Sequence, residues 1–154
     1  MPKIKLAIAS DHAGINLKKF LLENCKEAEM LDLGPASLDS VDYPDFAKKA
    51  CSSLLKGDVE KVILVCGSGV GMSIAANKIS GIRAAHVESI FTAQLAGEHN
   101  QANVLCLGER VTGSHHALAM VNAWLKAKFG GENTDSGAIS RHQKRIDKIK
   151  DLEK

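Results

Sequence analysis

The sequence predicts an α/β fold: a five-stranded parallel sheet with helices on both faces. Five short apolar runs are bounded by turn residues, and segments with apolar residues at helical spacing separate them. Parallel strands need a crossover connection, usually a helix, and a sheet covered on both faces has strands that are apolar throughout. The alternation therefore favours a parallel sheet between two layers of helices.

The chain begins with a strand, a helix and a second strand. Residues 4–10 (IKLAIAS) are a short apolar run, as expected for a buried strand. Residues 14–25 place leucines and a phenylalanine at helical spacing. Residues 30–34 (MLDLG) are expected to form a second strand, closed by Gly34.

The next segment leads into the third strand. A polar loop, residues 35–43, precedes Pro44, and proline suits the first turn of a helix. That helix is expected to continue to Gly57. Residues 61–66 (KVILVC) then form the third strand.

Two further helix–strand units follow a glycine-rich loop. Residues 72–79 are expected to be helical, and residues 82–87 (IRAAHV) form the fourth strand. Ser89 is a plausible cap for a helix over residues 89–100. Residues 103–108 (NVLCLG) form the fifth strand.

The last part of the chain is expected to be helical. Residues 114–129 have the pattern of a long amphipathic helix. Residues 130–137 (GGENTDSG) are expected to be a flexible connector, and residues 138–154 a charged terminal helix.

Length and composition indicate one domain over residues 1–154, because a chain of this size can bury a single core. The net charge of +2 gives no argument for a nucleic-acid or membrane partner. The sequence shows neither a signal peptide nor an apolar run of membrane-spanning length. Its four scattered cysteines favour reduced thiols, and we therefore expect a cytoplasmic protein.

Ligands of open α/β sheets bind at the carboxyl ends of the strands. Here the first strand ends in SDHAG, the third in CGSGVG and the fifth in GERVTG. We expect all three ends to lie on one edge of the sheet. This would bring Asp11 and His12 close to Cys66 and Arg110.

The glycine-rich loop is the most informative of these strand ends. Gly67, Gly69 and Gly71 alternate, which matches neither the dinucleotide fingerprint nor a Walker loop. Glycines let the backbone expose successive N–H groups, and the following helix adds its positive end, so the loop can cradle an anion. A tight turn without a ligand remains an equal alternative on the glycine spacing alone.

Cys66 stands at the mouth of this loop. A thiol beside aligned N–H donors at a helix N-terminus is stabilised as the thiolate and can act as a base or nucleophile. The alternative is a small core residue that ends a buried strand.

Three further groups of residues have side chains that commonly take part in catalysis or ligand binding. Asp11 and His12 follow the first strand, although His12 could be a helix-capping turn residue. His99 and Asn100 precede the fifth strand, where a solvated loop is the alternative. The terminal helix carries two arginines on one face, Arg141 and Arg145, which could hold a phosphate or lie in solvent.

Six motifs together resemble one enzyme family. They are SDHAG, the pair Tyr43–Pro44, CGSGVGMSIAANK, GIRAA, HNQANVLCLGERV and RHQKR. The combination resembles the type B ribose-5-phosphate isomerases, whose family also contains galactose-6-phosphate isomerases. The resemblance runs from Ile4 to about Ile146.

The resemblance implies a metal-independent aldose–ketose isomerase with no cofactor. It would interconvert ribose 5-phosphate and ribulose 5-phosphate through an enediolate, in the pentose phosphate pathway. The implied fold is a Rossmann-like, three-layer α/β/α domain. The implied assembly is a homodimer, or a tetramer of paired dimers, with active sites shared between subunits. We expect the C-terminal helix to extend to the partner subunit.

The resemblance also implies roles for single residues. Cys66 would move the proton between C1 and C2, and His99 would open the furanose ring. The loop backbone would hold the enediolate oxygen, while Asp11 and Asn100 would bind sugar oxygens. His12 and the three arginines would hold the phosphate, some of them from the partner subunit. The expected substrate-binding residues are Asp11, His12, Tyr43, Gly67, Ser68, Gly69, Val70, Gly71, Asn100, Arg110, Arg141 and Arg145.

Two alternatives stay open. The first is an isomerase of a hexose 6-phosphate, allose or galactose 6-phosphate. The second is a phosphate- or nucleotide-binding module without catalysis. The thiol, His99 and the arginine pair favour the pentose phosphate isomerase. The family often has threonine where Ser68 stands, which keeps the hydroxyl, and the connector at 130–140 is longer than in compact members.

Overall fold

The computed structural model describes residues 2–132 and 136–154. Its centre is a parallel five-stranded sheet with the order β2-β1-β3-β5-β4. The strands are β1 (Ile4–Ser10), β2 (Ala28–Asp32), β3 (Lys61–Cys66), β4 (Ala84–His86) and β5 (Val104–Gly108). The predicted α/β class and parallel sheet are therefore confirmed.

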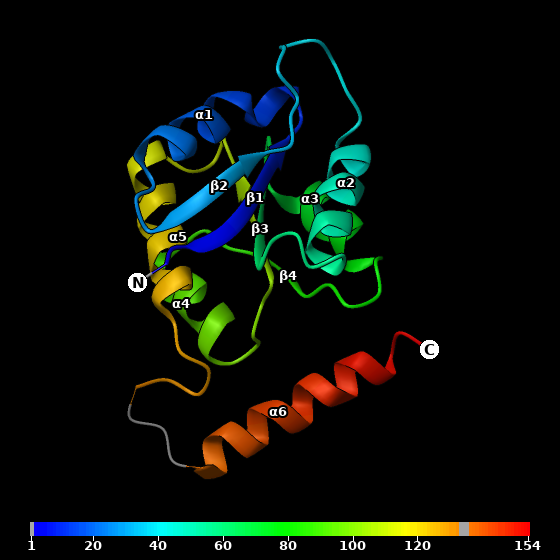
Figure 1. The fold of residues 1–154 in the computed structure, drawn as a ribbon, viewed down its shortest axis with the longest axis vertical. Helices are drawn as coiled ribbons and strands as arrows, with labels where there is room; N and C mark the ends of the chain where they lie inside the picture. The colour runs from blue at the N-terminus through cyan, green and yellow to red at the C-terminus, as the bar shows by residue number, and fades with distance from the viewer. Residues whose placement is uncertain (1, 133–135) are drawn as a thin grey trace.

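Helices cover both faces of this sheet (Figure 1). One face packs against α1, α4 and α5, with Trp124 of α5 fully buried in that layer. The other face packs against α2 and α3, where Met72 is fully buried. The helices are η1 (His12–Gly14), α1 (Ile15–Asn24), α2 (Tyr43–Leu55), α3 (Val70–Asn77), α4 (Ile90–Glu98), α5 (Ser114–Lys126) and α6 (Ser136–Asp151). None of the helices in the described parts of the chain has the length and apolarity needed to cross a membrane.

Two predicted helix features are confirmed. Pro44 lies in the first turn of α2, where its missing N–H costs no hydrogen bond. Ser89 caps α4, because its side chain accepts a hydrogen bond of 3.1 Å from the Thr92 N–H.

Several predicted boundaries were wrong. The second strand begins at Ala28 and not at Met30, where its apolar run starts. Backbone pairing with β1, which begins with Ile4 opposite Ala28, sets this start. Helix α3 begins at Val70, inside the expected loop, because Gly69 turns the chain with φ +81°. Part of the expected 130–137 connector is helical, since α6 begins at Ser136; residues 133–135 lie outside the described structure.

Helix α6 lies apart from the helices that cover the sheet (Figure 1, orange to red). The segment between β2 and α2 extends from the opposite end of the molecule. Just after α6, the Glu153 carboxylate accepts hydrogen bonds from the Ser80 hydroxyl and the Gly81 N–H. Ile146 is buried, whereas the arginines on this helix are exposed.

Candidate active site

A cavity of about 400 Å³ opens at the carboxyl ends of β1, β3 and β5. The expectation that these three strand ends share one edge is therefore confirmed. The cavity is lined by Asp11, His12, Ala13, Tyr43, Cys66, Gly67, Ser68, Gly71, Arg110 and Val111. Eight of these residues are predicted site residues, and Gly69 and Val70 belong to the same loop.

Cys66 ends β3 at the wall of this cavity and is 4% exposed. The Gly69 N–H donates a hydrogen bond to its sulfur over 3.1 Å. Gly69 can turn back in this way because its φ of +81° is readily available only to glycine. The sulfur therefore has a backbone donor at the atom that would hold negative charge in a thiolate.

Two other thiols have different surroundings. Burial raises the pKa of Cys51 to about 11. Burial, with smaller contributions from Cys51 and Cys66, raises the pKa of Cys106. Neither residue lines the cavity. Both are therefore held as neutral thiols in the core, whereas Cys66 can meet a ligand.

The backbone of β5 holds the glycine-rich loop in place. The Glu109 N–H donates to the Cys66 carbonyl over 2.9 Å, and the Arg110 N–H donates to the Gly67 carbonyl over 3.0 Å. Gly108 packs so closely on the loop that an added Cβ would lie 2.5 Å from the Ser68 carbonyl carbon. Strand and loop therefore form one rigid wall of the cavity.

Asp11 and His12 form the wall contributed by β1. One Asp11 carboxylate oxygen caps η1, because it accepts the N–H groups of Ala13 and Gly14 over 2.9 and 3.1 Å. The capping residue of this turn is thus Asp11, although His12 was the capping alternative. The His12 Nδ1 accepts a hydrogen bond of 3.2 Å from the Val41 N–H.

Tyr43 closes the cavity from α2. Its ring lies over Gly71, where an added Cβ would come within 2.7 Å of the ring carbon Cζ. A glycine at this position is required by the close approach of the ring. The Arg110 side chain packs on the loop at Gly67, with its Nη1 3.3 Å from the position of an added Cβ.

The remaining predicted residues do not line this cavity. His99 follows the end of α4, and its ring stacks on His142 of α6 with a centroid distance of 4.3 Å and an angle of 15°. Arg141 and Arg145 flank His142 in sequence on that helix. Asn100 is exposed, and its carbonyl accepts a hydrogen bond from the Arg83 side chain. We call His99, Asn100, Arg141, His142 and Arg145 the histidine–arginine group.

The charges of this group affect His142 directly. Desolvation lowers the pKa of His142, and the neighbouring His99, Arg145 and Arg141 lower it further. An imidazole in this position is thus neutral near pH 7, and the two arginines supply the positive charge. Such a group suits a phosphate.

Sequence reasoning missed several residues of these two regions. Val111 and Ala13 line the cavity but carry no chemical signature. His142 lies within RHQKR, and its position between the two arginines was an available signal. Glu109 accepts a short hydrogen bond of 2.6 Å from the Leu17 N–H and so joins the end of β5 to α1.

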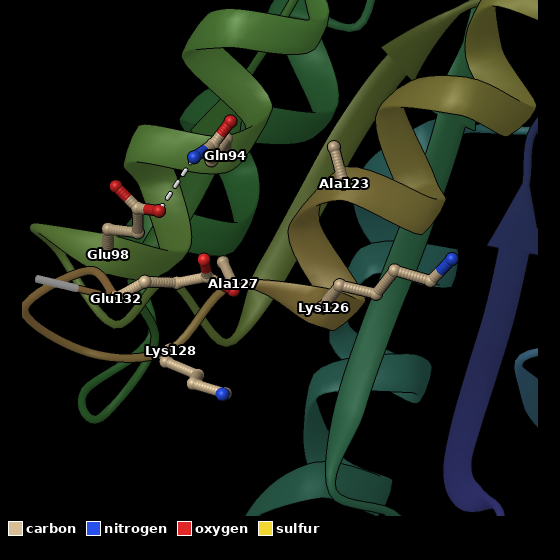
Figure 2. Close-up of a pocket in the computed structure, with 7 residues that line it drawn as sticks. All are labelled: Gln94, Glu98, Ala123, Lys126, Ala127, Lys128 and Glu132. Carbon is tan, nitrogen blue, oxygen red and sulfur yellow. Dashed lines mark hydrogen bonds between the residues drawn. The ribbon is translucent and has the colours of Figure 1, made fainter.

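A second cavity, of about 520 Å³, lies between the ends of α4 and α5 and the segment that follows (Figure 2). In it Gln94 donates to the Glu98 carboxylate over 2.7 Å, and the Lys126 ammonium points away from that carboxylate. Lysines and carboxylates mix along its wall, and none of its lining residues is a thiol, a histidine or part of the glycine-rich loop. The cavity beside Cys66 is therefore the candidate active site.

Comparisons with known proteins show which proteins this chain resembles. The ribose-5-phosphate isomerase B of Escherichia coli is 40% identical over 151 residues, covering 97% of this chain and 96% of its own. The solved structure of Clostridium thermocellum ribose-5-phosphate isomerase B is similar to this chain, with a TM-score of 0.89, 43% identity and 97% coverage of both chains.

A third similar protein carries a ligand. The crystal structure of ribose-5-phosphate isomerase B from Mycoplasma genitalium with bound ribulose-5-phosphate matches with a TM-score of 0.86 at 42% identity, covering 99% of this chain and 98% of that one. The family model described as Ribose/Galactose Isomerase matches residues 6–149. The chain therefore belongs to the ribose/galactose isomerase family.

Proposed function

We propose that this chain is a single-domain isomerase that interconverts ribose 5-phosphate and ribulose 5-phosphate. The observation that carries the proposal is the Cys66 thiol at the cavity wall, 3.1 Å from the Gly69 N–H. The similar Mycoplasma genitalium protein, which binds ribulose-5-phosphate, supports the choice of a pentose phosphate.

The proposed reaction is a proton transfer between neighbouring carbons. The Cys66 thiolate removes the proton from C2 of the open-chain aldose, and the electron pair forms the C1–C2 double bond of an enediolate. The oxygen on C1 takes up negative charge, and the loop N–H groups stabilise it. Preorganised donors of this kind contribute about 3–4 kcal/mol each. The proton then returns to C1 and the O2 proton passes to O1, which leaves a ketone at C2.

The histidine–arginine group would complete the site from a partner subunit. Its arginines are exposed on α6 and do not line the cavity of their own chain, and two arginines on one helical face suit a phosphate. In a homodimer, α6 of one subunit could reach the Cys66 cavity of the other. His99 would then open the furanose ring, and Arg141 and Arg145 would join His12 and Arg110 at the phosphate.

The direct test is turnover of purified protein on ribose 5-phosphate, followed as formation of ribulose 5-phosphate. We expect equal rates with and without a chelator, since the proposed chemistry uses no metal or cofactor. Allose 6-phosphate and galactose 6-phosphate are assayed in parallel. A higher kcat/KM on either hexose phosphate would replace the pentose phosphate as the substrate. If none of the three sugar phosphates is turned over, the alternative of a phosphate-binding module without catalysis would be favoured.

A further inference from the structure

One segment contacts His12, a residue of the cavity wall, through a backbone N–H. Residues 33–42, which connect β2 to α2, bring the Val41 N–H to 3.2 Å from the His12 Nδ1. A histidine nitrogen that accepts a hydrogen bond carries no proton, so in the neutral ring the proton is on Nε2. Because Nδ1 already accepts this hydrogen bond, the Nε2–H of His12 is the group that can donate to a ligand in the cavity.

The same segment is anchored at its other end by a buried lysine. Lys18 of α1 is 1% exposed, and its ammonium lies 2.8 Å from the Asp32 carboxylate and 2.6 Å from the Pro35 carbonyl. The Asp32 carboxylate also accepts the Gly34 N–H over 2.9 Å. A buried ammonium is costly unless it is paired and hydrogen-bonded, and these partners supply that compensation.

Between these anchors the segment is open to solvent. Residues 36–40 are exposed, and the hydrogen bonds described for their side chains are local, between Ser37 and Asp39. The Gly34 carbonyl accepts the Ser10 N–H over 3.0 Å, which ties the start of the segment to the end of β1, two residues before His12. The path of the segment, and so the position of Val41, depends on its two ends.

We infer that residues 33–42 are a positioning segment that holds His12 as its Nε2–H tautomer, and that Lys18 anchors this segment. The inference rests on the proposed function, in which His12 contacts the phosphate. An Nε2–H group donates to a phosphate oxygen, whereas the other tautomer would present a lone pair to the anion. Lys18 itself does not line the cavity and acts through the segment.

The tautomer is measured first, in the ligand-free protein, by nitrogen NMR with labelled histidine. We expect His12 to show a protonated Nε2 and an unprotonated Nδ1, assigned by the loss of one signal in His12→Gln. A protonated Nδ1 in the folded protein would overturn the inference. This result does not depend on which sugar phosphate the enzyme uses.

Kinetics then test the two anchors. Val41→Pro removes the N–H donor, and we expect the KM for ribose 5-phosphate to rise about tenfold with a much smaller change in kcat. Val41→Ala keeps the N–H and should stay near the wild-type KM. Lys18→Met should raise KM in the same direction and populate both His12 tautomers, whereas Lys19→Met, at the exposed neighbouring position, should do neither.

The outcomes separate the inference from the proposed function. An inactive wild-type protein would remove the function and leave the tautomer measurement standing. If the wild type is active and Val41→Pro, shown by circular dichroism to be folded, has an unchanged KM, the inference is overturned. If Val41→Pro does not fold, a single His12 tautomer in Lys18→Met with wild-type KM would overturn it.

Discussion

The cavity beside Cys66 and the histidine–arginine group differ in what builds them. The wall of the cavity around Cys66 is built from backbone: a strand end, glycines and N–H groups held by hydrogen bonds to the backbone of β5 and the residues after it. The histidine–arginine group consists of side chains, with Arg141 and Arg145 exposed on a helix apart from the sheet. Under the proposed function the two regions are complementary: the cavity would supply the base, the oxyanion donors and the phosphate contacts of His12 and Arg110. The histidine–arginine group would add the ring-opening histidine and two further arginines.

The contrast predicts how each half tolerates change. The backbone wall around Cys66 is closely packed, so an added side-chain atom there should lower the stability of the fold. Exposed side chains on a peripheral helix can be replaced without loss of fold, and their loss should appear only in binding or turnover.

The largest effect is expected at Cys66. Cys66→Ala should lower kcat by about 10³-fold or more, because the base is lost while the phosphate contacts remain. Cys51→Ala is the matched control, since that thiol is buried in the core at α2 and should leave turnover near wild type. Initial rates and substrate binding by calorimetry check both. Near-normal turnover in Cys66→Ala would remove the assignment of the base.

The second prediction joins the two regions across subunits. Cys66→Ala and the Arg141→Ala/Arg145→Ala double variant should each be inactive, yet active when mixed and allowed to exchange subunits. In a heterodimer one site collects both lesions and the other collects neither, so activity should approach half of wild type per heterodimer. Fully exchanged mixtures that stay inactive would show that the arginines serve their own subunit or no phosphate.

The third prediction separates ring opening from proton transfer. His99→Asn should lower turnover of ribose 5-phosphate by about 10²-fold, a typical contribution of general acid–base catalysis. Turnover of ribulose 5-phosphate should fall far less, because this ketose cannot close to a furanose. Initial rates in both directions, measured far from equilibrium, decide the point. Equal losses would contradict a role in ring opening.

The fourth prediction concerns the rigid wall. Gly108→Ala should destabilise the fold by about 3 kcal/mol, because its Cβ would lie 2.5 Å from the Ser68 backbone. Gly113→Ala is the control, since an added Cβ there meets no atom within 4 Å. Thermal unfolding compares the two variants. A wild-type Tm for Gly108→Ala would show that the loop can move aside.

The smallest effect is expected where α6 meets the domain. Hydrogen bonds from Gly81 and Ser80 lower the pKa of Glu153. This contact, just after α6, is therefore present near neutral pH and is lost only as pH falls below the ordinary pKa of a glutamate. The protection factors of the α6 amides, which are corrected for the intrinsic pH dependence of exchange, should fall at low pH, and Glu153→Gln should show lower protection already at pH 7. Asp147→Asn, whose carboxylate bonds only within α6 in the described contacts, is the control.

The sheet and the glycine-rich wall of the cavity could be predicted from the sequence, because each depends on residues that are consecutive in the chain. Cys66, its glycines and the next helix are consecutive, so their geometry follows from nearby residues. The start of β2 was mispredicted, because Ala28 and Glu29 are held by pairing with β1 and not by their own pattern.

Other features depend on contacts between distant segments. The Val41 N–H that meets His12 is a backbone donor, and any residue except proline would supply it. Lys18 and Asp32 come together only once α1 lies against β2. The stacking of His99 on His142 depends on where α6 lies, which the residue pattern alone does not determine.

The attachment of the glycine-rich loop to β5 has a consequence for the timing of turnover. With the Cys66 and Gly67 carbonyls bonded to the backbone of Glu109 and Arg110, the loop cannot serve as a lid that opens to admit sugar and closes over it. Control of entry and exit would then fall to a part outside the loop, such as α6, which lies apart from the helices that cover the sheet (Figure 1). In such an enzyme, solvent viscosity and truncation of the C-terminus would alter product release, while the intrinsic rate of carbon–hydrogen cleavage, seen as a deuterium isotope effect on single turnovers, would stay the same.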